Sequence, residues 1–127
     1  TPEEVETRST AAFSATDDAT RIAELSQLNG VRVPVASTIL AMWNPQQHAV
    51  IDFRALRALP AANPELVDHS DYAEFAAFLE LFRTYGSDPD AYTFYIEQVR
   101  DLADEHDLLP REVDMALWEY DRRRTES

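Results

Sequence analysis

"LNGVRVPVASTILAMWNPQQHAVIDFRALRAL" (residues 28–59) is the stretch that decides the fold. It contains Gly30, one of only two glycines in the chain, and Pro34 follows four residues later. Glycine is the preferred left-handed terminator of a helix, whereas proline suits a first helical turn because it lacks an N–H donor. We therefore expect one helix to end at Asn29–Gly30 and a short, largely buried helix to cover 35–43. The pattern predicts two helices joined by a tight turn.

Asp52 stands near the other end of this stretch, directly before "FRALRAL", which predicts a further short helix. An aspartate in front of an apolar helix is a favoured N-cap, worth about 1 kcal/mol. A carboxylate in the same place is also available for chemistry or for a ligand. The sequence leaves these roles of Asp52 open.

Helix signals continue towards the N-terminus. Thr1, with Pro2 behind it and Glu4 three residues on, forms a capping box for a helix over 2–14. Thr16 is the expected cap of the next helix, whose acidic first turn suits the helix dipole. The N-terminal part is therefore expected to supply two helices.

The sequence pattern of the C-terminal half also predicts helices. Pro60 and Pro64 predict a linker around "PAANPE", and the expected helices beyond it cover 70–85, 88–107 and 110–124. The predicted core face of the last helix consists of Val113, Ala116 or Leu117, and Tyr120. No strand alternation or internal repeat is present. The sequence predicts a single all-α domain over 1–127 with about seven helices.

Charge is the strongest signal in the composition. The chain has 24 acidic and 11 basic residues, all 11 basic residues are arginine, and the net charge is −13. We interpret a lysine-free, strongly acidic chain as the product of a halophilic organism, in which an acidic surface maintains solubility. The alternative is a high-GC genome that favours arginine. At about 1 M salt the Debye length falls to about 3 Å, so this charge does not exclude a nucleic-acid partner.

The composition also excludes several kinds of site. Without cysteine there is no disulfide, thiolate nucleophile or iron–sulfur cluster. The three histidines His48, His69 and His106 lack partners at ligand spacing, so we expect no metal and no cofactor. No apolar run reaches the roughly 18 residues of a membrane span, and no signal peptide opens the chain, so we expect a cytoplasmic protein without membrane contact.

The segment 28–59 resembles the helix-hairpin-helix element of the DNA glycosylase superfamily of endonuclease III. In that family a hydrophobic-Gly-Val-Gly hairpin is followed, about twenty residues on, by a catalytic aspartate and often by an arginine five residues later. Here Gly30 and Val31 match the hairpin, Asp52 the catalytic position and Arg57 the arginine. The chain also resembles microbial proteins without an assigned activity that carry a similar "GVPVAS…IDFR" segment.

The resemblance implies a helix-hairpin-helix element at about 17–59, C-terminal helices at about 70–124, and a partial glycosylase-like helical barrel. Arg32 stands where the family has its second glycine, and Pro34 where bifunctional members have a Schiff-base lysine. Because the chain has no lysine, any glycosylase activity has to be monofunctional. The family places more helices before the hairpin than the two expected here, which implies a truncated barrel.

For function we therefore expect DNA as the partner, with Asp52 as the catalytic carboxylate. The residues expected to contact DNA are Gly30, Val31, Arg32, Val33, Arg54 and Arg57. Asp52 is the only carboxylate between Gly30 and Leu59, so the arginines of this segment form either a positive patch or ion pairs with carboxylates elsewhere. The alternative function is a non-catalytic helical module for DNA or protein contact. A homo-oligomer, or an N-terminal partner segment that completes the barrel, also stays open.

Overall fold

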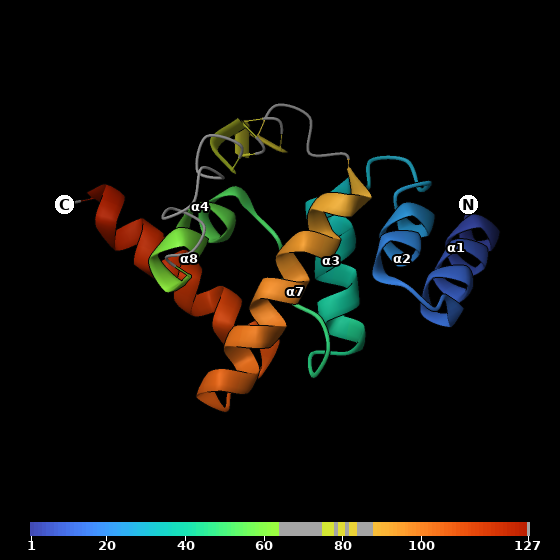
Figure 1. Ribbon diagram of the computed structural model, residues 1–127. Helices are drawn as coiled ribbons and strands as arrows, with labels where there is room; N and C mark the ends of the chain where they lie inside the picture. Colours follow the sequence, from blue (N-terminus) through green and yellow to red (C-terminus); the bar gives the residue numbers. More distant parts are fainter. Residues whose placement is uncertain (64–74, 78, 81, 84–87, 127) are drawn as a thin grey trace.

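The structure, a computed structural model, describes residues 1–63, 75–77, 79–80, 82–83 and 88–126 (Figure 1). No strand occurs among these residues, and the predicted all-α class is confirmed. The short described pieces between 75 and 83 are helical, whereas the expected ends of that helix, Ser70 and Gly86, lie outside the described residues, as do Pro64 and His69. The continuous helices are α1 (Pro2–Ser14), α2 (Asp18–Leu25), α3 (Val33–Trp43), α4 (Phe53–Ala62), α7 (Pro89–His106) and α8 (Pro110–Glu126).

Helix α7 runs through the middle of the molecule. Figure 1 shows α1 and α2 on one side of α7 and the pair α4 and α8 on the other, with the two termini at opposite ends. Helix α2 packs on α1 and on α7, and α4 packs chiefly on α8. Helix α7 also packs on α8, so it contributes to the core of both halves. Its buried large side chains are Tyr92, Tyr95, Ile96 and Val99.

Local capping chemistry sets the ends of the N-terminal helices. The capping box between Thr1 and Glu4 is present as predicted. The expectation for α2 was wrong by one residue, because Asp17 rather than Thr16 caps it and accepts the Thr20 N–H at 2.8 Å. Helix α2 also ends earlier than expected, at Leu25, because tighter three-residue turns follow Ser26.

Helix α4 continues through Pro60, so the prediction that this proline breaks the chain was wrong. A proline inside a helix removes one backbone hydrogen bond and crowds the preceding turn. Pro60 stands in the last turn of α4, where it removes the hydrogen bond that an N–H at this position would donate to the Leu56 carbonyl. The buried side chains of Leu56 and Leu59 hold this turn against the core, and the Asn63 N–H bonds the Leu59 carbonyl at 2.8 Å.

The buried face of α8 also differs from the prediction. Val113 and Leu117 are buried as expected, but Tyr120 is 47% exposed. Two aspartates, Asp114 and Asp121, take buried places on this face instead. A carboxylate tolerates burial only when charged or hydrogen-bonding groups meet it. Asp114 and Asp121 each have one arginine partner on α8 itself and a further partner on another element.

Candidate functional site

Residues 49–52 form the last part of the connection from α3 to α4 and bond to three helices. Their backbone is held by side chains from all three. Val50 donates its N–H to Asp114 of α8 at 2.7 Å and accepts the Tyr95 hydroxyl of α7 at 2.9 Å. Ile51 donates its N–H to the Ser37 hydroxyl of α3 at 3.0 Å. These hydrogen bonds determine how the chain enters α4.

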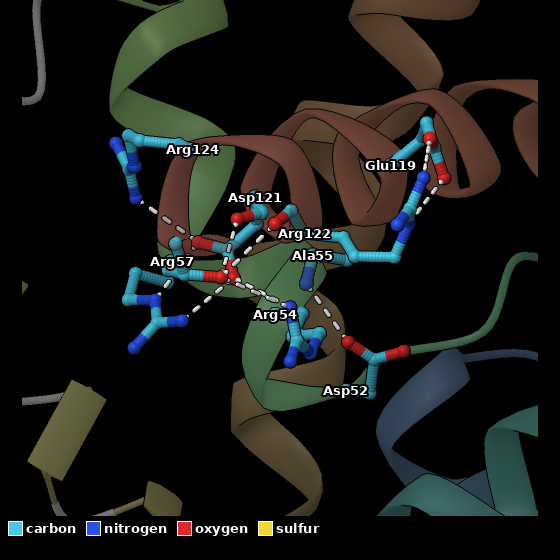
Figure 2. A network of polar contacts seen from close by, with 9 residues as sticks. Asp52, Arg54, Ala55, Arg57, Glu119, Asp121, Arg122 and Arg124 are labelled. Atoms are coloured by element: carbon cyan, nitrogen blue, oxygen red, sulfur yellow. Dashed lines mark hydrogen bonds and ion pairs between the residues drawn. The ribbon is translucent and has the colours of Figure 1, made fainter. Parts of the chain in front are cut away.

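Asp52 follows this segment and caps α4. Its Oδ1 accepts the Ala55 N–H at 2.8 Å, so the predicted cap is confirmed (Figure 2). Among the described residues Oδ2 has no hydrogen-bond partner, and the side chain is only half-buried. One carboxylate oxygen therefore holds the helix while the other remains available.

A pocket of about 500 Å³ opens at Asp52. This volume lies in the range of small-molecule sites, and four of the seven lining residues are charged. Trp118, which is 38% exposed, contributes the aromatic surface rather than Trp43, which stacks on Phe13 with 4.6 Å between ring centroids. The pocket is lined by Val50, Asp52, Arg111, Asp114, Met115, Trp118 and Glu119.

Asp114 is the second acid of this pocket. Burial raises the pKa of its carboxyl to about 6, against the lowering effects of the Val50 N–H and of Arg111, with which it forms an ion pair. Sequence reasoning missed Asp114, because only apolar residues were assigned to the core face of α8. The available signal was its spacing, three residues before Leu117 and seven before Asp121, which places these three residues on one helical face.

The turn before α3 has the conformation that the sequence predicted. Gly30 adopts a φ of +83°, and the Val31 N–H is used within the turn, where it bonds the Leu28 carbonyl at 3.1 Å. Arg32 is the N-cap and its side chain is exposed, whereas the side chain of Val33 is fully buried. Of the four expected contact residues in this turn, only Arg32 can therefore offer a charged side chain.

The N-terminus of α3 still presents backbone donors. The first N–H groups of a helix have no acceptor within the helix, and Pro34 at the second position has no N–H. The amides of Val33 and Val35 remain, and their position at the positive end of the helix dipole suits an anion. Ile51 bonds Ser37, the fifth residue of α3, so the segment that leads to Asp52 lies beside the N-terminal half of this helix.

Arg54 and Arg57 of α4 meet the buried carboxylate of Asp121 (Figure 2). Arg57 donates from Nε at 2.8 Å and from Nη2 at 2.7 Å, and these bonds raise its pKa and lower that of Asp121. Arg54 lies 3.7 Å from the same carboxylate, and its guanidinium lies over Trp118 at 5.6 Å from the ring centroid. Arg54 therefore reaches the wall of the pocket, whereas Arg57 is committed to α8.

The histidines show two different environments. His48 lies in the loop between α3 and α4 and is only 2% exposed, and its Nδ1 lies 2.7 Å from the Tyr92 hydroxyl. Burial lowers the pKa of His48 to about 4. His106 is exposed at the end of α7, on the rim of a second pocket of about 240 Å³ with otherwise apolar lining and few groups able to orient a ligand.

Within the described part of the chain, no three histidine or acidic side chains gather as a metal would require. The described helices include none with the length and apolarity needed to cross a membrane. Comparison with protein-family models, curated proteins and solved structures found no match. Functional inference therefore rests on the residues around Asp52 and on the resemblance of segment 28–59.

Proposed function

We propose that the chain binds DNA and releases a base from it, with Asp52 as the carboxylate at the reaction centre. The pocket at Asp52 is the observation that carries this proposal. It combines an available carboxylate oxygen with the exposed ring of Trp118, and the segment that leads to Asp52 is bonded to α3. Enzymes that act on a base take it out of the helical stack and hold it against aromatic side chains, which this pocket could accommodate.

Phosphate contact would come from the turn before α3 and from α4. The amides of Val33 and Val35, the exposed guanidinium of Arg32 and the half-buried guanidinium of Arg54 are the donors offered. Arg54, Arg57 and Arg124 share the single carboxylate of Asp121, so a positive patch lies beside the pocket, whose own lining holds three acids and Arg111. Such a patch offers short-range hydrogen bonds to phosphate, and the ionic part of its affinity falls as the salt concentration rises.

The proposed reaction is hydrolysis of the N-glycosidic bond. The bond between the sugar C1′ and the base nitrogen breaks, and its electron pair leaves with the base. Water adds its oxygen to C1′, Asp52 accepts one proton of that water, and this proton then passes to the departing base nitrogen. The products are the free base and an abasic sugar. While the bond is breaking, the Asp52 carboxylate also stabilises the positive charge that develops on the sugar.

The test compares the wild type with Asp52→Asn on a panel of duplexes that carry damaged bases, in molar KCl. Asparagine is as good an N-cap as aspartate, so this variant keeps α4 capped and removes only the charge. We expect base release in the wild type and a loss of at least about 100-fold in the variant. Equal release by both proteins, or release by neither, would contradict the proposed activity.

A second function is favoured by one observation. The Oδ1 of Asp52 caps α4 through Ala55, a role that requires no chemistry. A non-catalytic module that uses the same surface to contact DNA would keep this cap. Fluorescence anisotropy with a labelled duplex, combined with the base-release assay, separates the two functions. A non-catalytic module binds the duplex, but neither the wild type nor Asp52→Asn releases a base.

A further inference from the structure

We infer that Asp114 is the positioning residue of this site, because it holds the Val50 amide and so fixes the direction in which Asp52 faces the pocket. The inference rests on the proposed function for its catalytic consequence. Asp114 and Asp52 line the same pocket from different elements, and they are far apart in the sequence. No role for Asp114 followed from the resemblance of segment 28–59.

The contacts of Asp114 show how it would act. Its Oδ2 accepts the Val50 N–H at 2.7 Å and its Oδ1 pairs with Arg111, so both oxygens are occupied and neither is offered to a substrate. Its side chain is 4% exposed. A buried carboxylate is costly, and this one is retained where it bonds the backbone two residues before Asp52. These contacts indicate that Asp114 fixes the backbone at Val50 rather than binding a substrate.

The hydrogen bonds of segment 49–52 add to this restraint. Ser37 fixes the Ile51 amide from α3, and Tyr95 donates to the Val50 carbonyl from α7. The Val50 N–H has Asp114 as its acceptor, so removal of that carboxylate leaves a partly buried donor unsatisfied. Segment 49–52 would then shift or open locally, and Asp52 would move with it. A misplacement of about 1 Å at a reacting group can reduce a rate by on the order of 100-fold.

Three variants test the inference. Asp114→Ala removes the acceptor, whereas Asp114→Asn keeps an oxygen that can accept the Val50 N–H and removes the charge. Asp121→Ala is the matched control, since Asp121 is also a buried, arginine-paired carboxylate of α8 but does not contact segment 49–52. The control separates loss of this backbone contact from general weakening of α8.

The first readout is amide hydrogen exchange, which needs no substrate. Exchange at Val50 and Ala55 is compared with that at Ile96, whose fully buried position in α7 reports on global unfolding. In Asp114→Ala we expect exchange at Val50 and Ala55 to rise by about tenfold relative to Ile96, which corresponds to the loss of one hydrogen bond to a charged acceptor. Asp114→Asn should restore most of the protection, and Asp121→Ala should leave the ratio unchanged.

The second readout is single-turnover base release together with duplex affinity. We expect Asp114→Ala to slow release by on the order of 10- to 100-fold with little change in Kd, and Asp114→Asn to recover much of the rate. The inference is wrong if exchange at Val50 and Ala55 is unaltered in Asp114→Ala, if Asp121→Ala changes it equally, or if release stays at the wild-type rate. Absence of release from the wild type contradicts the proposed function instead, and the exchange measurement then decides the inference alone.

Discussion

Arg57 donates two hydrogen bonds to the buried carboxylate of Asp121, a residue 64 positions later in the chain. This pair joins α4 to α8 at the helix contact that carries the candidate site (Figure 2). Bidentate arginine–carboxylate pairs are among the stronger polar contacts in proteins because two parallel bonds fix both position and orientation. The change in the free energy of unfolding when this pair is removed therefore measures how much the contact between α4 and α8 contributes to stability.

Removal of the Asp121 carboxylate should destabilise the protein. We expect Asp121→Ala to lower the free energy of unfolding by about 2–3 kcal/mol, because three arginines, Arg54, Arg57 and Arg124, then lose a shared acceptor. Urea denaturation measures the change. Arg123→Ala is the control, since Arg123 is 77% exposed and its loss should cost less than about 0.5 kcal/mol. An equal effect of both variants would show that the buried contact adds nothing.

The cap of α4 predicts a contrast between two substitutions of one residue. Asp52→Ala should lower the free energy of unfolding by about 1 kcal/mol, because the Ala55 N–H loses its acceptor. Asp52→Asn should stay within about 0.5 kcal/mol of the wild type, since asparagine caps equally well. Chemical denaturation of both variants is the measurement, and equal losses would argue against a capping role.

Gly30 tests the turn before α3. Its φ is +83°, and no atom lies within 4 Å of the place where a Cβ would stand, so Gly30→Ala should cost only conformational energy. We expect a loss of about 1–2 kcal/mol for alanine and a smaller loss for Gly30→Asn, because asparagine tolerates left-handed backbone. Thermal and urea unfolding should agree on this order. Equal stability of Gly30→Ala and the wild type would contradict the assigned turn.

His48 predicts a dependence of stability on acid. Its pKa is about 4 in the fold, below the ordinary value of 6.5, because it is buried. The neutral form is therefore favoured by folding. Its contribution is complete above about pH 6.5 and is lost as the pH falls towards 4, at up to about 1.4 kcal/mol per pH unit.

The comparison of His48→Gln with the wild type between pH 7 and pH 4.5 isolates this contribution. Asp114 acts in the opposite direction over part of the same range, because its pKa is raised to about 6 and protonation then favours the fold. Both proteins retain Asp114, so its contribution cancels in the difference. We expect the free energy of unfolding to fall less steeply with acid in His48→Gln. Parallel pH profiles would contradict a buried neutral histidine.

Arg32 tests the proposed phosphate contact. If its guanidinium meets one phosphate, Arg32→Ala should weaken binding to all duplexes alike and reduce the slope of log K against log salt by about 0.9. Arg8→Ala is the matched control, because Arg8 is a half-exposed arginine that pairs with Glu24 between α1 and α2. An equal change in both variants would indicate only the effect of net charge.

The helices and most of their ends could be predicted because they depend on residues within one turn. Thr1 with Glu4, and Asp52 with Ala55, are contacts over three positions, and their chemistry is readable from a short window. The left-handed Gly30 and the buried apolar faces of α2 and α7 follow from the same local rules. The errors at Thr16 and Pro60 were likewise local, and they changed element ends without changing the fold.

The candidate site, in contrast, depends on contacts that no local pattern contains. Asp114 and Asp121 are charged residues on a helix face that periodicity assigns to apolar side chains. Their burial is tolerated because Val50 and Arg57, each 64 positions earlier, are brought to them by the packing of α8 on the other helices. The sequence by itself determined the all-α class and Asp52 as a helix cap. Only the tertiary structure decided that a pocket opens at Asp52, because its walls come from segments that meet after the chain has folded.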